Sequence, residues 1–395
     1  MLEKQMIKFI LSKWNYGNFR IVFWDQEEFY VGNQPAKFSL IFKEKIPLLK
    51  LFSDTSLVFA KHYMESKLEI EGDYDEIAKV LYYFSNKRFL KNKEDILSKI
   101  AQKEESKNIK SHYDIGNDFY RLWLDDTMSY SCAYFKTSSD TLYEAQINKI
   151  EHTLKKLDLK PNEKLLDIGC GWGWLSIMAA QKYGVKVVGV TISEEQCKKA
   201  QERVRELKLE DRVEIRLQNY QDLEFEDYFD KVVSVGMFEH VGKENLGLYF
   251  MKAKQVLKPG GSMLLHSILA MFEGKTNAWI DKYIFPGGYL PSLREVVSAM
   301  SEWDFHLLLA ESLRIHYAKT LDIWSENFNQ VLPQVREKYD EEFVRMWDLY
   351  LRSCASAFRV GSVDLFQFLI TKEINNNLSL TKEYIYKQIL NLNLI

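Results

Sequence analysis

The sequence is poor in cysteine, and its few cysteines are not spaced as a metal site or a redox pair. Four cysteines occur in 395 residues, namely Cys132, Cys170, Cys197 and Cys354. They form no CxxC pair and lack the close spacing of zinc ligands. The pattern predicts reduced thiols in a cytosolic protein and no metal site.

The sequence also lacks a strong net charge and a long apolar run. The formal net charge is -3 and the isoelectric point is near 6.2, which disfavours nucleic acid as the main partner. No apolar run approaches the roughly 20 residues that span a bilayer. Lysines interrupt the opening stretch MLEKQMIKFILSKW, so it does not have the continuous apolar core of a signal peptide. Any contact with a membrane is therefore expected from its surface.

The chain is long enough for two domains, and its first part indicates a small mixed one. Helical spacing predicts an amphipathic helix whose apolar residues are Leu2, Met6, Phe9, Ile10 and Trp14. We favour packing of this helix on its own domain over a membrane-surface helix. Short β-like runs follow at residues 20–24, 28–31 and 36–42.

A basic, polar stretch then separates the two domains. Residues 87–110 carry eight lysines and arginines against four acids. We interpret the stretch as a solvated linker, with a surface for anionic lipid head groups as the alternative. The boundary is placed near residue 105, giving domains 1–105 and 106–395.

The second domain alternates strands with helices, which predicts a doubly wound α/β sheet with parallel strands. The expected strands are 164–167, 185–192, 212–217, 230–235, 262–268, 307–315 and 365–371, and the expected helices are 174–183, 193–209, 245–257, 320–332 and 341–358. Residues 258–261 are expected to turn into the fifth strand. Residues 271–293, rich in aromatics and glycine, interrupt this alternation, and the run FPGGYLPSL within them (residues 285–293) is expected to form a loop or lid.

The stretch KLLDIGCGWG identifies the class of cofactor. A buried strand ends at Asp167, and Gly169, Gly171 and Gly173 alternate before a helix, as in a turn that lets a ligand approach the backbone and the helix N-terminus. A dinucleotide site would have GxGxxG and an acid about 20 residues on. Here Thr191 ends the second strand, so the pattern favours S-adenosylmethionine.

Ser193 and Gln196 stand at capping-box spacing before the second helix. Gln196 can either complete the cap or contact a ligand. The two uses need different side-chain geometry, so the structure can distinguish them.

Taken together, the motifs resemble those of the cyclopropane-fatty-acyl-phospholipid synthase family, relatives of the mycolic acid cyclopropane synthases. The resemblance covers roughly residues 55–370 and rests on HYDIGNDFY, MSYSCAYF, LLDIGCGWG, GVTISEEQ, VSVGMFEHVG, LLHSI, FPGGYLPSL and IHYAKTLDIW, in that order. It implies a Rossmann-like methyltransferase sheet with a helical cap, plus an N-terminal domain like that of the phospholipid-acting members.

The resemblance implies methyl transfer to a cis double bond of an unsaturated phospholipid acyl chain. An alkene is a poor nucleophile, so catalysis depends on positioning it near the sulfonium methyl group. The resulting carbocation must be shielded from water and then lose a proton, and in the family bound bicarbonate is the base. The open alternatives are a methyl-branched acyl product, an N-methylated amine, and a lipid-binding scaffold without activity.

The resemblance also implies the site residues. The bicarbonate site maps onto the side chains of Glu239, His266 and Tyr317 and the backbone of Cys132 and Ile268. Glu239, His266 and Tyr317 follow or end predicted strands four, five and six, at the edge where open α/β sheets bind ligands. His266 by itself would more often be a core histidine, and thiol chemistry at Cys132 is disfavoured because no basic partner lies nearby in the sequence.

Further residues are implied for the cofactor and the acyl chain. The cofactor residues are Tyr130, Ser131, Asp167, Gly169, Gly171, Thr191, Gln196, Asn219 and Tyr220. At Asn219 and Tyr220, which would meet adenine, the sequence departs from relatives that carry an acid or a Trp. Aromatics that would line an acyl tunnel, or else belong to the core, are Phe135, Trp172, Phe238, Phe272, Tyr283 and Phe285. His112, Asp114 and Asn117 are expected as hydrogen-bonding residues of the cap.

The resemblance finally suggests partners and location. We expect a cytoplasmic homodimer that acts peripherally at the inner face of the membrane.

Overall fold

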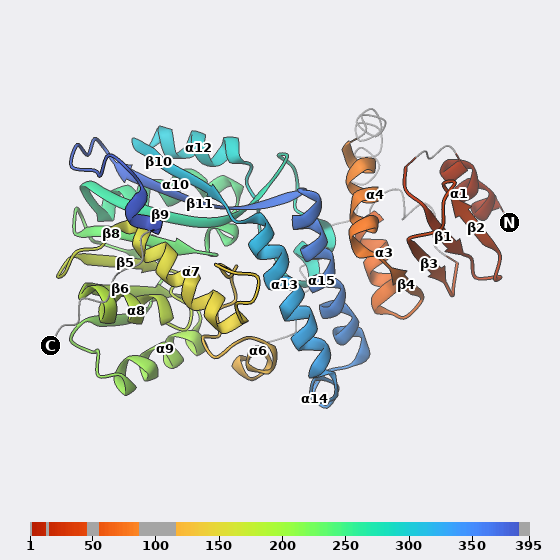
Figure 1. Cartoon of the computed structure of the whole chain (residues 1–395), viewed down its shortest axis with the longest axis horizontal. Helices are drawn as coiled ribbons and strands as arrows, with labels where there is room; N and C mark the ends of the chain where they lie inside the picture. Colours follow the sequence, from red (N-terminus) through yellow and green to blue (C-terminus); the bar gives the residue numbers. More distant parts are fainter. Residues whose placement is uncertain (1, 13–15, 46–54, 87–115, 387–395) are drawn as a thin grey trace. The chain divides into compact units, whose positions relative to one another are not determined.

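The computed structural model describes residues 2–12, 16–45, 55–86 and 116–386 (Figure 1). It divides into two compact units, which are described separately. The first comprises Met1–Asp114, Gly274–Gly287 and Leu321–Ser362, and the second comprises Ile115–Glu273, Gly288–Thr320 and Val363–Ile395. The predicted basic linker, the boundary near residue 105, and His112 and Asp114 lie outside the described residues.

The first unit contains a small sheet of order β2-β1-β3-β4. Its strands are β1 (Phe19–Val22), β2 (Glu28–Val31), β3 (Phe38–Phe42) and β4 (Leu68–Gly72). The predicted helix is α1 (Leu2–Ser12). Lys4 and Lys8 of α1 form ion pairs with Asp25 and Glu27, in the turn between β1 and β2. The helix therefore packs on its own sheet, as expected.

Helices from two distant parts of the chain complete this unit. They are α3 (Thr55–Met64) and α4 (Tyr74–Asn86) from the first part, and α11 (Ala278–Tyr283), α14 (Leu332–Arg336) and α15 (Glu341–Val360) from later parts. Arg345 of α15 donates to the Tyr63 and Leu68 carbonyls and pairs with Glu69. One backbone carbonyl at the end of α3 and one at the start of β4 are thereby satisfied by a side chain from the later helix.

The second unit is built on a sheet of seven strands, in the order β10-β11-β9-β8-β5-β6-β7. The strands are β5 (Lys164–Ile168), β6 (Lys186–Thr191), β7 (Val213–Leu217), β8 (Phe229–Val235), β9 (Leu257–Ala270), β10 (Phe305–Ser312) and β11 (Val363–Lys372). Strand order reverses between β5 and β8, which makes the fold doubly wound, as predicted.

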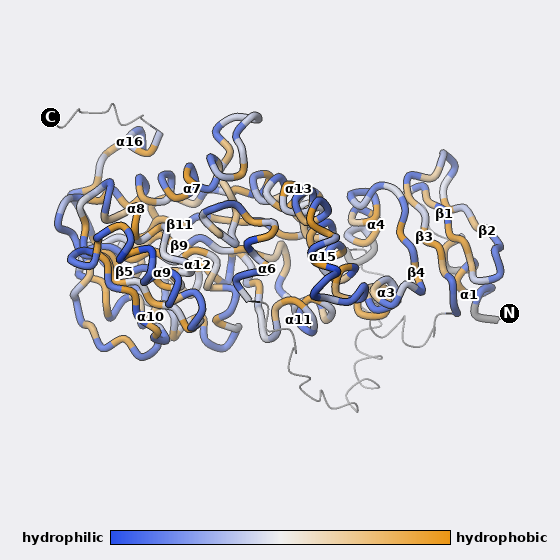
Figure 2. The backbone as a smooth tube through the Cα atoms, turned by 90° about the horizontal axis from the view of Figure 1, so that it is seen from below, coloured by the Kyte–Doolittle hydropathy of each residue, from blue (hydrophilic) through white to orange (hydrophobic). Residues whose placement is uncertain are grey.

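Helices cover both faces of this sheet. On one face α7 (Leu142–Leu157), α8 (Trp174–Tyr183) and α9 (Glu194–Glu206) share a core with the strands, and on the other α10 (Leu246–Val256) and α12 (Leu293–Glu302) do so. Neighbouring residues such as Leu165 and Leu166 face opposite cores, because side chains alternate along a strand. Figure 2 shows α9 as mostly hydrophilic, since only a narrow stripe of it is buried.

Several sequence predictions need correction. Strand β11 runs antiparallel to both β9 and β10, so the sheet is mixed. Residues 258–261 belong to β9 and do not form a separate turn. The predicted strand 307–315 ends at Ser312, and α13 (Arg314–Gln330) begins where strand was expected. The short helix α11 within residues 271–293 was not predicted, whereas the run FPGGYLPSL forms a loop up to Ser292, as expected.

The second unit also has two helices before its sheet and near its end, α6 (Asn117–Trp123) and α16 (Glu383–Tyr386). Among the described residues, no helix is both long enough and apolar enough to span a bilayer.

Candidate active site

The glycine turn joins β5 to α8 at the carboxyl end of the parallel strands. Gly169 and Cys170 both donate to the Val190 carbonyl, which fixes the turn against β6. A Cβ on Gly169 would lie 2.7 Å from Met237, whereas a Cβ on Gly171 would meet nothing within 4 Å. Both residues have positive φ, 80° and 55°, which favours glycine. Gly171 therefore borders open space in which a ligand can approach the backbone.

Asp167 lies beneath this turn and is buried. Its Oδ2 atom accepts a hydrogen bond from Ser176 of α8 at 2.7 Å. Burial raises the pKa of Asp167 to about 6, against the lowering effects of Ser176 and Lys149. The carboxyl group thus ties the end of β5 to the first turns of α8.

Thr191 and Gln196 form a hydrogen-bonded pair at the end of β6. The Thr191 hydroxyl donates to Gln196 Oε1 at 3.2 Å. Ser193 accepts from the Gln196 backbone N–H at 3.4 Å and so caps α9. The Gln196 side chain does not return to the Ser193 backbone, so the capping box is incomplete. The Gln196 side chain is therefore used by Thr191 and not by the helix cap.

Ser131 and Tyr130 lie on a segment held by two buried residues of α7. Gln146 donates to the Ser131 carbonyl at 3.0 Å, and Lys149 Nζ donates to Ser131 Oγ at 3.0 Å. A Cβ on Gly236, just after β8, would lie 3.9 Å from Ser131. The segment therefore reaches the same edge of the sheet as the glycine turn.

Tyr130 belongs to an aromatic cluster with residues of α6. Its ring centroid lies 5.2 Å from that of Tyr120 and 5.8 Å from that of Trp123. Trp172 of the glycine turn donates to Asn117 Oδ1 at 2.8 Å. Asn117 therefore forms a side-chain hydrogen bond, as expected for a residue in the helical cap of the methyltransferase domain.

Asn219 and Tyr220 follow β7. Asn219 caps the short 3-10 helix η1 (Tyr220–Asp222) by accepting from the Gln221 backbone N–H at 3.0 Å. Tyr220 is half-buried and packs edge-on against Tyr249, with ring centroids 5.4 Å apart. These contacts give both residues a structural role at this edge.

Glu239 is half-buried in the short helix η2 (Phe238–His240) after β8, and its Oε2 atom is shielded from solvent. Its Oε1 accepts from the Ile268 backbone N–H of β9 at 2.7 Å, while Oε2 has no partner among the described residues. Burial raises the pKa of Glu239 to about 7, and the Ile268 N–H opposes that shift. Near neutral pH the group can therefore both hold and release a proton.

His266 is almost fully buried in β9, two residues before Ile268. Its Nδ1 atom lies 3.0 Å from the side-chain amide nitrogen of Gln367, and Nε2 has no partner among the described residues. Burial, together with nearby lysines, holds the pKa of His266 well below its usual range. The imidazole is therefore neutral.

Cys132 lies beside the start of α13, the helix that carries Tyr317. Cys132 Sγ lies 3.9 Å from the Leu313 carbonyl, and the next residue, Ala133, donates its N–H to Thr320 at 3.0 Å. Tyr317 lies between Leu313 and Thr320 on this helix and is buried. It thus sits on a helix, not at the end of a strand as predicted. Because β10 is parallel to β9, α13 still begins at the same edge.

The buried Cys132 thiol is unsuited to nucleophilic chemistry. Burial raises its pKa far above the usual range. Such a thiol stays protonated, and the thiolate is the reactive form.

The aromatic residues expected around an acyl chain fall into separate groups. Phe238 is fully buried in the core among Tyr249 and Phe250, which gives it a packing role. Phe135 is buried beneath Lys319, whose Nζ lies 4.2 Å from the ring centroid, and Phe272 is 60% exposed. Tyr283 and Phe285 belong to the first unit.

The polar face of α7 is buried, and the sequence did not predict it. It consists of Gln146, Lys149, His152, Thr153 and Lys156. Lysine and histidine at helical spacing ordinarily indicate a solvated face. The available signal was the spacing itself, because 146, 149, 153 and 156 recur with a helical period.

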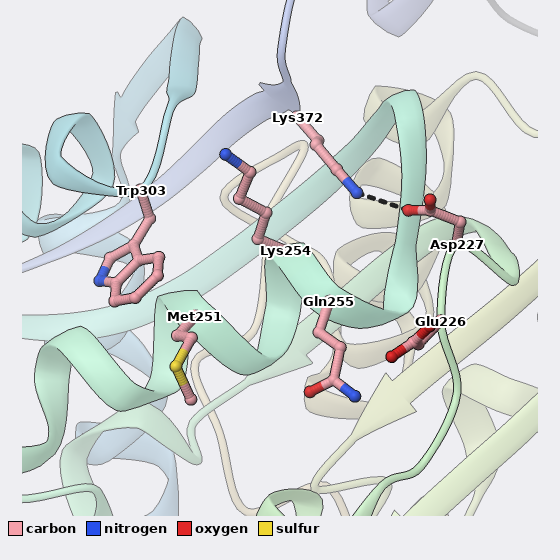
Figure 3. A pocket seen from close by; sticks show the side chains of 7 residues that line it. All are labelled: Glu226, Asp227, Met251, Lys254, Gln255, Trp303 and Lys372. Carbon is pink, nitrogen blue, oxygen red and sulfur yellow. Dashed lines mark hydrogen bonds and ion pairs between the residues drawn. The ribbon is translucent and has the colours of Figure 1, made fainter.

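A surface pocket of about 320 Å³ lies elsewhere on the second unit (Figure 3). It is lined by Glu226, Asp227, Met251, Lys254, Gln255, Trp303 and Lys372. Asp227 precedes β8 and Gln255 precedes β9, so the pocket opens at the amino-terminal edge of these strands. Its seven lining residues include none of the predicted site residues.

The geometry defines a class of protein. A glycine turn with open space, a polar pair after the second strand and buried titratable groups at the same sheet edge are the parts of an S-adenosylmethionine-dependent methyltransferase. The sequence matches the family model described as mycolic acid cyclopropane synthetase over residues 100–368. Residues 6–94 match a domain family of unknown function.

Similar proteins agree with this class. A Pseudomonas putida protein named "Probable fatty acid methyltransferase" is 38% identical over 93% of this chain and 96% of its own length. The cyclopropane-fatty-acyl-phospholipid synthase of Escherichia coli K12 is 44% identical over 69% of this chain and 70% of its own. The solved mycolic acid cyclopropane synthase CmaA1, complexed with SAH and CTAB, is 38% identical with a TM-score of 0.63, covering 67% of this chain and 97% of its own.

The chain therefore belongs to the mycolic acid cyclopropane synthetase family, and it is an S-adenosylmethionine-dependent methyltransferase.

Proposed function

We propose that this enzyme adds one carbon from S-adenosylmethionine to the cis double bond of an unsaturated phospholipid acyl chain and closes a cyclopropane ring. The name of the Escherichia coli relative supports this substrate. The proposal rests on the pair Glu239 and His266 at the cofactor edge, whose Oε2 and Nε2 atoms are buried and have no partner among the described residues. Buried polar atoms are rarely left unsatisfied without a functional reason.

The cofactor fits the glycine turn and its neighbours. Gly169 and Gly171 offer the backbone approach, Thr191 and Gln196 offer hydroxyl and amide groups, and Tyr130 and Ser131 border the same edge. Asp167 ties the turn to α8, and we keep Asn219 and Tyr220 as the proposed adenine contacts. S-adenosylmethionine, when bound, supplies an electrophilic methyl group for the alkene to attack.

An oxyanion such as bicarbonate fits the buried groups. Neutral His266 and protonated Glu239 can each donate a hydrogen bond, and we propose Tyr317 and the Cys132 backbone as further contacts. Ile268 holds Glu239 through its backbone N–H. Bicarbonate, when bound, supplies a base for the proton that ring closure releases, and Glu239 can receive or return that proton because its pKa is about 7.

Burial of these groups suits the proposed chemistry. A carbocation beside water would be trapped as an alcohol, so the site has to exclude solvent. His266, Cys132 and Tyr317 are buried, and Glu239 is half-buried with its Oε2 atom out of contact with solvent. The same burial brings each charge-bearing group into an environment where its interactions are stronger than in water.

We further propose that the chain is a cytoplasmic homodimer that binds the inner face of the membrane. The N-terminal domain, residues 1–105, would assist this binding, and residues 106–395 form the methyltransferase domain. Lys4 and Lys8 of α1 are already paired with acids, so we do not assign the contact to this helix. Light scattering and co-sedimentation with vesicles test these two points.

Purified protein, S-adenosylmethionine and vesicles of cis-unsaturated phospholipid provide the direct test. We expect acyl chains heavier by one methylene, without the olefinic protons and with cyclopropane protons in the NMR spectrum. Unchanged acyl masses would overturn the proposal. Because a methyl branch that keeps the double bond gives the same mass gain, only the NMR spectrum separates that alternative. An N-methylated amine would place the added mass on the head group.

The role of bicarbonate is tested separately. Removing bicarbonate from the buffer should slow turnover about tenfold or more, because the base lowers the barrier to the proton transfer. Turnover should recover when bicarbonate is returned. Binding of S-adenosylmethionine should be unchanged. An equal turnover rate with and without bicarbonate would exclude bicarbonate as the base.

A further inference from the structure

The buried face of α7 carries a chain of polar contacts that leads to His266. Figure 1 shows α7, in yellow, beside the sheet. Lys156 Nζ donates to Gln367 Oε1 at 2.6 Å. The Gln367 amide nitrogen lies 3.1 Å from Thr153 Oγ1 and 3.0 Å from His266 Nδ1. Gln367 is directly opposite His266 in the β9–β11 pairing, so the two side chains lie on the same face.

The chemistry of Lys156 fixes the orientation of this amide. Lys156 is buried and forms an ion pair with Glu311, which also contacts His152 Nε2 at 2.7 Å. An ammonium group has donors only, so the amide atom facing it must be the oxygen. The NH₂ group of Gln367 then faces His266 and Thr153.

The orientation of the amide determines the tautomer of His266. An NH₂ group donates, so His266 Nδ1 has to accept and carries no proton. The neutral ring must then carry its proton on Nε2. That atom is buried and has no partner among the described residues.

We propose that Gln367, held by Lys156 and Thr153, is a positioning residue that fixes His266 in the Nε2–H form, so that the imidazole presents a donor to an oxyanion at the active site. The inference rests on the proposed function for the identity of that oxyanion. The tautomer itself can be measured without any activity.

Nitrogen-15 NMR of protein labelled in histidine provides the first readout. The chain has seven histidines, and the signals that disappear in His266→Asn identify the ring. We expect a protonated Nε2 and an unprotonated Nδ1. A protonated Nδ1 with a bare Nε2 in the wild-type protein would overturn the proposal.

Gln367→Glu provides the second readout, because a carboxylate beside Nδ1 accepts and does not donate. We expect Nδ1 to become protonated and kcat to fall about 10- to 100-fold, as other losses of a histidine-orienting partner do. KM for S-adenosylmethionine should stay within about twofold of wild type. The matched control is Gln334→Glu on the exposed surface of α14, which makes the same substitution away from His266 and should keep both the tautomer and kcat.

The outcomes separate this proposal from the proposed function. An unchanged tautomer and unchanged kcat in Gln367→Glu would reject the positioning role. The expected tautomer in wild-type protein that makes no cyclopropane lipid would support the positioning and reject the function. If Gln367→Glu does not fold, Gln367→Met replaces it, and loss of the fixed tautomer is then the expected result.

Discussion

At the amino-terminal edge of the large sheet, Lys372 and Asp227 form an ion pair 2.5 Å long beside an open pocket. At the carboxyl-terminal edge, the Oε2 atom of Glu239 and the Nε2 atom of His266 are buried, and neither has a partner among the described residues. The ion pair at the first edge satisfies its two charges within the protein. The two buried atoms at the second edge carry a cost in stability, which a bound ligand would relieve. The candidate active edge is therefore distinguished by buried polar atoms without hydrogen-bond partners among the described residues, and the other edge by its open pocket.

The comparison is tested most strongly by Glu239→Gln. The amide can still accept from the Ile268 N–H, so the fold should survive, but it can no longer take up or release a proton. We expect kcat to fall about 10²- to 10⁴-fold while calorimetry shows normal binding of S-adenosylmethionine. The matched control at the pocket, Glu226→Gln, should leave kcat unchanged. Equal losses in both variants would remove the distinction between the edges.

The raised pKa of Glu239 predicts a dependence of stability on pH. The folded protein holds this proton up to about pH 7, whereas the ordinary pKa is 4.5. The contribution of the group to stability is therefore full below about pH 4.5 and declines as the pH rises through 7. Between pH 5 and pH 8, wild type should lose about 2 to 3 kcal/mol more than Glu239→Gln. Urea unfolding at the two pH values measures this, and parallel losses would contradict it.

Thr191→Val probes the polar pair at the cofactor edge. Loss of the hydroxyl that donates to Gln196 should weaken binding of S-adenosylmethionine about fivefold, in line with one hydrogen bond. Ser193→Ala is the control, since it removes only the cap of α9 and should cost about 1 kcal/mol of stability. Titration calorimetry measures the affinity of both variants for S-adenosylmethionine. A larger loss of affinity in Ser193→Ala than in Thr191→Val would contradict the assignment of Thr191 as the cofactor contact.

The smallest effect is expected at the pocket. Asp227→Asn removes an ion pair whose acid is 57% exposed, and Lys372 keeps its hydrogen bond to the Leu257 carbonyl. Unfolding free energy should fall by less than about 1 kcal/mol, and kcat should not change. A strong loss of activity would make this pocket part of the active site.

Local signals explain which parts of the fold were predictable. The strand β5 and the helix α8 were found from an apolar run and a set of glycines, which act within a few residues of sequence. The antiparallel direction of β11 depends on how the chain returns from α15, which leaves no local signal. The start of α13 was misplaced because its apolar residues suit either a strand or a helix.

The site residues, too, were predictable where they have a local signal in the sequence. Glu239 and His266 were predicted through family motifs and strand ends, and the structure places both at the expected edge. Lys156 and Gln367 were not predicted: the helical spacing of the polar residues on α7 does not distinguish a buried face from a solvated one, and Gln367 has no local signal. Their partners lie more than 100 positions away, at separations of 211 and 101 residues.

The inner position of β11 has a consequence for how the protein is made. This strand lies between β9 and β10, yet it is the last of the sheet to leave the ribosome. Until it emerges, β9 lacks a neighbour on one side and His266 lacks Gln367. A nascent chain that ends after α15 therefore contains the glycine turn but not the oriented histidine, so we expect the cofactor site to form during synthesis before the catalytic centre does.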